Sequence, residues 1–581
     1  MKKLMAKLLV LALCLSFCVP FTAFATDDPQ DVWGDVQQDN FVRITSSEAW
    51  KQGTFENTEL TEEVGNGAIR LAAGQTEGTW TSQELDVPAF EYMVATWSSD
   101  TPKGTSVEVR VRAYVDMKDA WSGWMSWGTW GIDRKRGCDD TADALAYVDT
   151  DILTIKGKSG ETASKIQVQI AMTTKGEETP VMRDVSFTSK NTLEGQAIPV
   201  YYPNAGIELP EKVLLDTPAY SQMRRDSAIG SVICSPTSVT MMLNDRNPAL
   251  DLFPEEIALR EYDFDYEGFG NWAFSLAIAG SFGYTVSNHY SDLDFVRQEL
   301  AAGRSVALSV RYANKTSGSN PYLQNGAAND TSGHLIVIVG YETIDGVDYF
   351  YSNDAATKPD SECALRLYRA DQLDVCWHSR IAYTMSLDTE EGAGQYAPIR
   401  VEGKLEPTEE FDVFDLVVDG QKVELSKGFS KKTSLLGAGT IFMITDTAKM
   451  DDMPEGMKRT TANMQLTYIT VTGEGKVRLP LDNLYDAGVT SGTVYIICNN
   501  GAGYEVPVTL PDPATRPTEA PTEAPTEAPT EAPTAAPTAA PTEAPTEAPA
   551  VEKSGMNPAI IVVGVAIVAA AVVVLVKSRK K

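Results

Sequence analysis

A four-residue repeat divides this chain of 581 residues into a part that can fold around a core and a part that cannot. From Pro517 to Pro549 the sequence runs through Pro-Thr-Glu-Ala and Pro-Thr-Ala-Ala units. A proline at every fourth position prevents a continuous helix, and the absence of large apolar side chains leaves nothing to bury. We therefore expect a spacer over residues 513–555, with the folded domains before it.

Apolar segments lie near both ends of the sequence. Residues 1–25 have basic residues, an apolar run and the small-x-small pattern Ala23-Phe24-Ala25, which together are typical of a signal peptide. Residues 556–576 carry no charge and would span a bilayer core as a helix, and basic residues follow at once. Because positive residues stay in the cytoplasm, we expect a transmembrane helix over 556–576 and a cytoplasmic tail over 577–581. The rest of the chain would lie outside a bacterial cell.

Charge and cysteine content narrow the range of partners. The net charge of −31 repels nucleic acid, so no nucleic-acid partner is expected. The cysteines beyond residue 25 show no paired metal-ligand spacing, and only three histidines exist, so we expect no metal and no cofactor. These cysteines are Cys138, Cys234, Cys363, Cys376 and Cys498. Cys363 and Cys376 could form a disulfide, and the sequence leaves that open.

The residues between the apolar start and the repeat are too many for one core, so several domains are expected. Residues 28–195 predict a β-sandwich, because Ser106–Val115 alternates between apolar and charged side chains. A group of tryptophans in this region fits core or loop packing better than sugar binding. Residues 391–512 predict a small β-rich accessory domain, with strands at 467–471 and 494–497.

Cys234 is the candidate nucleophile of the middle region. It begins the string Cys-Ser-Pro-Thr-Ser, which leads into a helical pattern that Ser235 or Thr237 can cap. Cys234 would then lie at a helix N-terminus. There the helix dipole and the unpaired N–H groups favour the thiolate and lower its pKa.

His334 is the candidate base for that thiol. It precedes the apolar run 335–339, and a turn at Asp345-Gly346 returns the chain toward Asn353 and Asp354. Either of these two side chains could orient the imidazole. Gln222, upstream of the nucleophile, could stabilise an oxyanion together with the backbone N–H of Cys234.

The other candidate residues have less distinctive surroundings. His289 is expected at the surface or at a sheet edge, and His378 follows a short helix that begins near Ala370. Neither precedes a buried strand. Trp272 could line a substrate cleft or pack a helix.

Together these motifs resemble cysteine peptidase family thirty-nine, which includes bacteriocin-leader-processing peptidases and is distantly similar to papain. The resemblance covers residues 213–390 and implies a papain-like α+β domain over 196–390. It rests on Tyr220-Ser221-Gln222, Cys234-Ser235-Pro236-Thr237-Ser238, Gly270-Asn271-Trp272, Gly333-His334-Leu335 and Ser352-Asn353-Asp354-Ala355. Ser235 departs from the Gly that the family more often has after its nucleophile.

The resemblance also implies roles for individual residues. Cys234 would be the nucleophile, His334 the general base and acid, Asp354 the orienting residue and Gln222 the oxyanion donor. Asn271 and Trp272 are the candidate substrate-binding residues.

We therefore expect a multidomain, membrane-anchored extracellular cysteine peptidase that acts on a peptide or protein, including cell-wall peptides. Two alternatives stay open. One is a non-catalytic surface adhesin with a papain-like domain. The other is a wall-peptide amidase or transglutaminase-like enzyme that uses the same residues.

Overall fold

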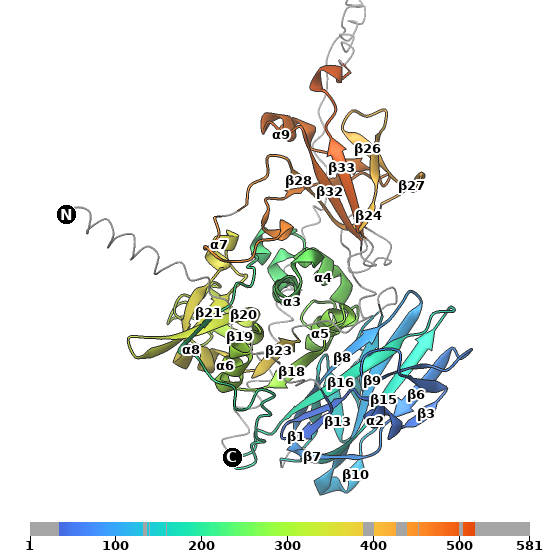
Figure 1. Ribbon diagram of the computed structural model, residues 1–581, viewed down its shortest axis with the longest axis vertical. Helices are drawn as coiled ribbons and strands as arrows, with labels where there is room; N and C mark the ends of the chain where they lie inside the picture. Colours follow the sequence, from blue (N-terminus) through green and yellow to red (C-terminus); the bar gives the residue numbers. More distant parts are fainter. Residues whose placement is uncertain are drawn as a thin grey trace, which may run out of the picture. The chain divides into compact units, whose positions relative to one another are not determined.

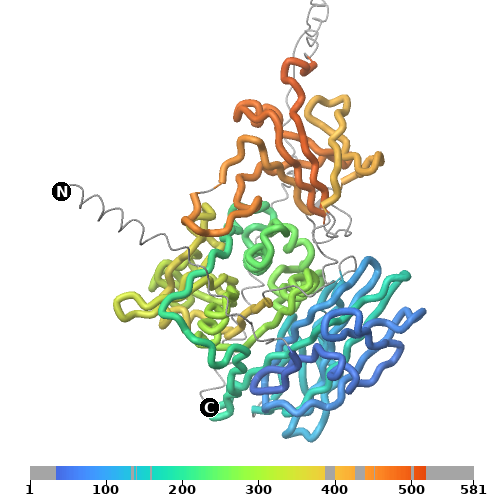
Figure 2. The backbone as a smooth tube through the Cα atoms, viewed as in Figure 1, coloured from blue at the N-terminus to red at the C-terminus, as the bar shows by residue number. Residues whose placement is uncertain are grey.

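The computed structural model describes residues 34–131, 136–138, 140–157, 160–386, 400–425, 438–450, 452–498 and 503–517. The expected signal peptide, transmembrane helix, cytoplasmic tail and all of the spacer after Pro517 lie outside these residues. Among the described helices, none is both long and apolar enough to span a bilayer. Figures 1 and 2 draw the N-terminal part (34–190) in blue to teal, the central part (212–386) in green to yellow and the C-terminal part (400–517) in orange.

The N-terminal part consists of two antiparallel sheets. Its strands are β1 (Val36–Gln38), β2 (Phe41–Ile44), β3 (Thr54–Glu56), β4 (Thr58–Thr61), β5 (Ala68–Leu71), β6 (Glu77–Thr81), β7 (Leu85–Phe90), β8 (Tyr92–Asp100), β9 (Thr105–Val115), β10 (Ala120–Trp121), β11 (Met125–Trp130), β12 (Thr141–Ala142), β13 (Ala146–Asp149), β14 (Ile152–Ile155), β15 (Ala163–Thr174) and β16 (Val181–Lys190). A short helix, α2 (Ser47–Lys51), and a 3₁₀ turn, η1 (Asp116–Lys118), connect strands. One sheet has the order β1-β2-β16-β8-β14-β13-β12, and the other has the order β10-β9-β15-β6-β3.

The alternation predicted for Ser106–Val115 is confirmed in β9. Val107, Val109 and Val111 are buried, and the residues between them are partly exposed. Side chains of both sheets share one hydrophobic cluster. The tryptophans divide between two environments: Trp97, Trp127 and Trp130 are buried in this core, whereas Trp121 and Trp124 are half-buried beneath the guanidinium of Arg112.

The central part is one antiparallel sheet with helices around it. Its strands are β17 (Lys212–Leu214), β18 (Val286–Tyr290), β19 (Val306–Ala313), β20 (Asp330–Ile344), β21 (Val347–Asn353), β22 (Arg366–Arg369) and β23 (Ile381–Met385). Its helices are α3 (Cys234–Arg246), α4 (Pro254–Glu261), α5 (Trp272–Ser281), α6 (Leu293–Ala301), α7 (Asp360–Cys363) and α8 (Ala370–Cys376), with 3₁₀ turns η2 (Gln222–Arg224), η3 (Gly230–Val232) and η4 (Pro248–Leu250). The strand order is β18-β23-β19-β20-β21-β22, with β17 paired to β20.

The long strand β20 separates two cores. Leu335, Val337 and Val339 belong to the cluster that includes α3, whereas Ile336 and Ile338 belong to the cluster on the opposite face. A strand buried on both faces reads as a continuous apolar run, which explains the sequence pattern after His334. The predicted turn at Asp345-Gly346 is confirmed, with both residues at positive φ.

Helix α3 begins differently from the expectation. Its N-cap is Ile233, which makes no side-chain capping bond, so the prediction that Ser235 or Thr237 caps the helix is wrong. Both residues lie inside the first turn, where the Thr237 hydroxyl donates back to the Ile233 carbonyl. Pro236 is tolerated there because N–H groups of a first turn have no partner within the helix.

The N-terminal part packs against α5 and β18 of the central part. The rings of Trp97 and Phe274 make an edge contact with centroids 6.1 Å apart. A side chain at Gly280 would meet the Cα of Ser98 at 2.9 Å, so glycine allows this close approach.

The same contact corrects the expectation for His289. It does lie on the edge strand β18, as one alternative expected. However, it is buried, and its ring stacks on that of Phe41 with centroids 4.5 Å apart. The ring that covers it comes from the N-terminal part, so the surroundings of His289 in sequence carry no sign of its burial.

The C-terminal part has two small sheets. Its strands are β24 (Arg400–Glu402), β25 (Lys404–Pro407), β26 (Val413–Val418), β27 (Gln421–Val423), β28 (Ala438–Thr445), β29 (Thr467–Tyr468), β30 (Thr470–Val471), β31 (Val477–Arg478), β32 (Ser491–Cys498) and β33 (Gly503–Thr509). A helix, α9 (Leu481–Asp486), and 3₁₀ turns η5 (Thr461–Asn463) and η6 (Pro513–Thr515) complete it. The predicted strand 494–497 is confirmed within β32. The predicted strand 467–471 is divided at Ile469, because β29 pairs with β28 in one sheet and β30 pairs with β31 in the other.

A buried ion pair of the central part also makes a hydrogen bond to the C-terminal part. Arg225 contacts Glu255 through Nε and Nη2, and Nη2 is 2.8 Å from Oε2. Its Nη1 donates to the Ala462 carbonyl at 2.9 Å.

We predict that Arg225→Met lowers the free energy of unfolding by about 3–5 kcal/mol, because Glu255 is left buried without its cation. Urea unfolding measures the loss. The double variant Arg225→Met, Glu255→Leu should regain most of it, and equal destabilisation of both variants would contradict this account.

Candidate functional site

Cys234 lies at the first position of α3, where its thiol is half-buried. Burial raises the pKa of this thiol, but a hydrogen bond from His334 and the charge of that imidazole lower it, with help from the backbone N–H groups of Leu335 and Ser235. The net pKa lies below the ordinary value of a thiol. The environment therefore favours the thiolate, which is the nucleophilic form.

The other described cysteines have the opposite environment. Cys138, Cys363, Cys376 and Cys498 are buried free thiols, and burial raises the pKa of each, to about 12 for Cys363 and about 11 for Cys376. The disulfide that the sequence left open between Cys363 and Cys376 is not formed. Among the described cysteines, Cys234 alone is activated.

His334 lies at the start of the buried run of β20, beside Asp354, which follows β21. Its Nε2 is 2.7 Å from Oδ1 of Asp354. Because Nε2 is occupied in this way, Nδ1 is the nitrogen left for Cys234. Burial lowers the pKa of His334, but the charge and hydrogen bond of Asp354, together with Cys234, raise it to about 10.

Asp354 is a fully buried carboxylate with several donors. Tyr312 and Tyr368 donate their hydroxyls to Oδ2 at 2.6 and 2.7 Å, and the backbone N–H of Ala356 donates to Oδ1 at 3.1 Å. Burial raises the pKa of Asp354, but His334 and the two phenols outweigh that effect and bring it to about 2. The carboxylate therefore stays charged at any physiological pH.

The structure distinguishes the two candidates for orienting His334. Asn353 turns away from the imidazole, since its Nδ2 donates to the Thr217 carbonyl at 2.9 Å and its Oδ1 accepts from Leu365 N at 3.1 Å. Asp354 is the residue that contacts His334.

Gln222 is held between the two halves of the site. Its backbone N–H donates to the carbonyl of Ala355, next to Asp354, and its Nε2 donates to the carbonyl of Gly230 at 3.0 Å, in the turn that leads to Cys234. A side chain at Gly230 would meet the Gln222 carbonyl at 2.7 Å, so glycine is required there. One amide hydrogen of Gln222 remains for a further acceptor.

Asn271 and Trp272 lie at the start of α5. Asn271 is buried; its Oδ1 caps the helix by accepting from Phe274 N at 3.1 Å, and its Nδ2 donates to Asp263 at 2.9 Å. Trp272 is half-buried against the hydrophobic core, and its backbone N–H donates to Oδ2 of Asp151 in the N-terminal part at 2.8 Å. These contacts build structure, and a role in substrate binding stays a prediction for both residues.

Three contributors to the site were missed in the sequence: Tyr312, Tyr368 and Gly230. The tyrosines lie on β19 and β22, in segments that carry no motif. The only signal available was a tyrosine near the end of each of these two strands, which β20 and β21 separate in the sheet.

The site groups a thiol, an imidazole and a carboxylate in the order that a thiol hydrolase needs. Comparison with known families agrees with this class: residues 40–189 match the Peptidase C39 N-terminal domain, and residues 214–380 match the Peptidase C39-like family. The chain is a C39 cysteine peptidase-like protein.

No curated protein matches the chain. Among solved structures it is similar to digestive procathepsin L 3 from the larval midgut of Tenebrio molitor, with 14% identity over 32% of this chain and 72% of that chain and a TM-score of 0.23. It is also similar to the carbohydrate-binding module TmCBM61 in complex with β-1,4-galactotriose, with 13% identity over 26% of this chain and 91% of that chain and a TM-score of 0.15. At these scores neither likeness defines the fold.

We predict that iodoacetamide labels Cys234 selectively in the folded protein. The lowered pKa of its thiol should keep the labelling rate high at pH 6–7, where an ordinary thiol with a pKa of about 8.5 reacts slowly. Mass mapping of labelled peptides across a pH series measures this. In guanidinium chloride all described cysteines should react alike. A labelling midpoint for folded Cys234 near pH 8.5, or equal labelling of Cys376, would contradict the prediction.

Proposed function

We propose that this chain is a cysteine peptidase that hydrolyses peptide or amide bonds through Cys234, His334 and Asp354. The observation that carries the proposal is the contact of Asp354 with His334 at 2.7 Å beside a thiol whose pKa is lowered by that imidazole. A thiolate and imidazolium held in this way form a nucleophile and a proton donor in one pair.

In the proposed reaction the Cys234 thiolate attacks the carbonyl carbon of the scissile bond. The oxyanion accepts from the backbone N–H of Cys234, which has no partner within the helix because it begins α3, and from the remaining amide hydrogen of Gln222. His334 donates its proton to the leaving amine. It then takes a proton from water, which attacks the thioester and releases the acid.

Asp354 holds the imidazole throughout this sequence. Its charge keeps Nε2 protonated, so the proton that moves belongs to Nδ1. Tyr312 and Tyr368 fix the carboxylate in turn. We propose a papain-like catalytic domain over residues 196–390, as the match to the Peptidase C39-like family suggests.

We further propose that the enzyme acts outside the cell while anchored to the bacterial membrane. The proposal rests on the apolar segments 1–25 and 556–576 and on the acidic net charge of −31. Its substrates would then be peptides or proteins of the cell surface.

Replacing Cys234 by Ala should abolish hydrolysis. We expect kcat/KM to fall by about 10³-fold or more, because the bond-forming atom is removed. The matched control is Cys376→Ala, which removes a buried thiol outside the site and should keep activity. Assays on a peptide library and on purified cell-wall material, run side by side, measure the loss and separate a peptidase from a wall-peptide amidase. Full activity in Cys234→Ala would refute the mechanism.

A further inference from the structure

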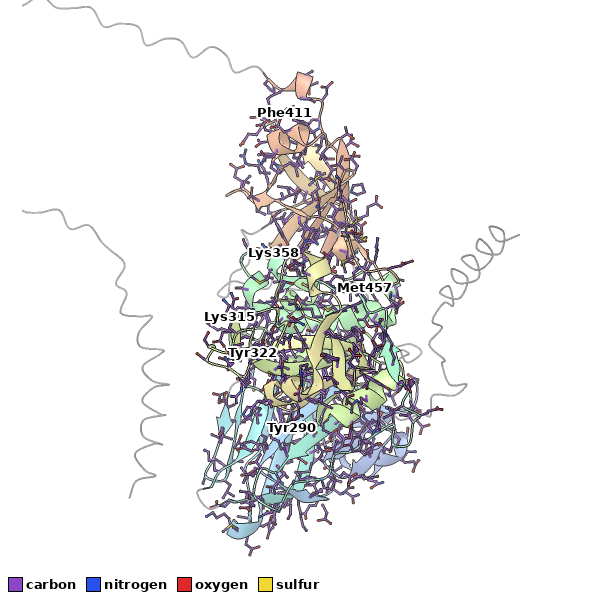
Figure 3. All side chains as sticks on the ribbon, turned by 90° about the vertical axis from the view of Figure 1, so that its left-hand side faces the viewer. Tyr290, Lys315, Tyr322, Lys358, Phe411 and Met457 are labelled. Carbon is purple, nitrogen blue, oxygen red and sulfur yellow. The ribbon has the colours of Figure 1, made fainter. Side chains whose placement is uncertain are left out.

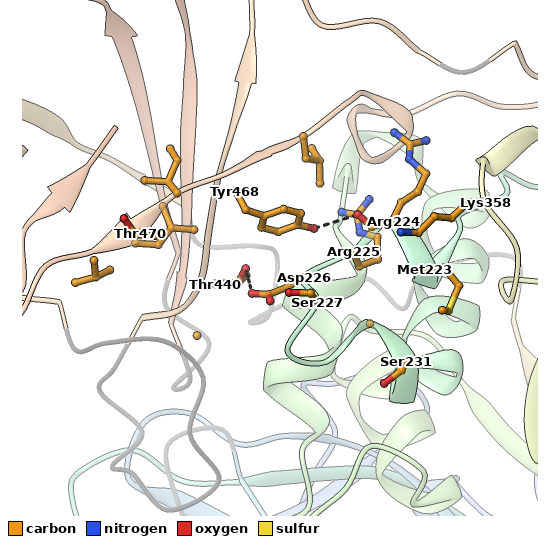
Figure 4. Close-up of a pocket in the computed structure, with 16 residues that line it drawn as sticks. Met223, Arg224, Arg225, Asp226, Ser227, Ser231, Lys358, Thr440, Tyr468 and Thr470 are labelled. Carbon is orange, nitrogen blue, oxygen red and sulfur yellow. Dashed lines mark hydrogen bonds between the residues drawn. The ribbon is translucent and has the colours of Figure 1, made fainter. Parts of the chain in front are cut away.

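A cavity of about 730 Å³ lies between the central and C-terminal parts. One wall is the segment from Met223 to Ser231, and the other is formed by strand residues of the C-terminal part that include Thr440, Tyr468 and Thr470 (Figure 4). Small-molecule and peptide pockets commonly have volumes of about 300–1,000 Å³, so the cavity has room for a substantial ligand.

The cavity adjoins the turn that positions the candidate nucleophile. Gly230 and Ser231 line it, and the Gly230 carbonyl accepts from Gln222. Ser231 precedes Cys234 by three residues, a stretch of at most about 11 Å. An extended chain that reaches Cys234 from this side would therefore run into the cavity.

The two arginines along the cavity are neutralised by carboxylates, whereas Asp226 and Lys358 have no ion pair among the described residues. Arg224 pairs with Asp360 at 2.7 Å, and Arg225 pairs with Glu255 at 2.8 Å. Asp226 accepts from the Thr440 hydroxyl at 2.7 Å. Lys358 is exposed and lines the cavity, and its ammonium has no ion pair or hydrogen bond among the described residues.

That lysine is an exposed cation without an ion pair on a chain whose net charge of −31 disfavours acidic ligands overall. Beside it the walls are partly apolar, with Met223 38% exposed and Leu466 half-buried. A cationic group next to apolar surface suits a peptide segment that combines a carboxylate with an apolar side chain.

We propose that this cavity is a substrate subsite that holds peptide residues next to the scissile bond, with Lys358 paired to an acidic side chain of the substrate. The inference rests on the proposed peptidase function and adds a substrate class to it. The subsite includes residues of the C-terminal part, such as Thr440 and Tyr468, which lie outside the match to the Peptidase C39-like family. The C-terminal part would therefore contribute directly to substrate specificity.

The test uses the full chain and the peptide that it cleaves best from a library. That peptide is resynthesised with Asp, Asn or Lys at each position flanking the scissile bond. At one of these peptide positions, the wild type should cleave the Asp peptide with a kcat/KM roughly threefold to tenfold higher than the Lys peptide. Lys358→Glu should reverse this preference. The preference should also shrink as salt is added, because an exposed ion pair is screened.

Lys315→Glu is the matched control, since Lys315 is another exposed lysine of the central part and does not line the cavity (Figure 3). It should keep the wild-type preference.

A second variant, Thr470→Trp, should fill the cavity. It should lower kcat/KM about tenfold for long peptides relative to a short ester substrate. Its control is Thr447→Trp, on an exposed residue outside the cavity, which should not lower this ratio.

The outcomes separate the two proposals. If the wild type cleaves no peptide, the proposed function fails. The subsite is wrong if the wild type cleaves peptides but neither test variant differs from its control. In that case Lys358→Glu prefers Asp over Lys as Lys315→Glu does, and Thr470→Trp cleaves long peptides as well as Thr447→Trp does. The peptidase function would then stand without the subsite.

Discussion

The hydrogen bond between His334 and Asp354 is the interaction on which the rest of the site depends. A fully buried carboxylate is costly unless charge and hydrogen bonds compensate it, and here side chains from three nearby strands supply that compensation. Tyr312 comes from β19, His334 from β20 and Tyr368 from β22, while Asp354 itself follows β21. The antiparallel order β19-β20-β21-β22 thus brings together groups that are far apart in sequence. Because the carboxylate stays charged, it favours a protonated imidazole, and the charge of that imidazole in turn lowers the pKa of the Cys234 thiol.

Helix α3 places the thiol beside this imidazole, since Cys234 is its first residue. Nearly all the other residues of the helix are buried. It packs against α4, α5 and β20. Ser235 stands where the family more often has Gly. Its buried hydroxyl has hydrogen-bond partners, since it lies 2.7 Å from the hydroxyl of Ser275 and 3.2 Å from that of Tyr383. The N-terminal part packs against α5, so it also supports the packing around the site.

Much of the site could be predicted because local patterns encode it. The apolar run after His334 and the Asp345-Gly346 turn define a hairpin, and a hairpin of that length returns the chain near His334. Sequence could not choose between Asn353 and Asp354, because successive residues leaving a strand point in different directions and the choice depends on register. Tyr312 and Tyr368 have no motif because their role arises only from strand order. The burial of His289 was missed since another part of the chain covers it, and the cap of α3 was missed since the helix begins before the serine and threonine that could cap it.

The central claim is that Cys234 and His334 form a thiolate–imidazolium pair held by Asp354. The chain has only three histidines, and burial lowers the pKa of both His289 and His378, so an NMR titration of labelled imidazoles can follow His334 alone. We predict that one imidazole keeps its proton through neutral pH and loses it near pH 10, and that Cys234→Ala moves this titration to lower pH. A His334 imidazole that titrates near its ordinary pKa of about 6.5, with or without Cys234, would contradict the account.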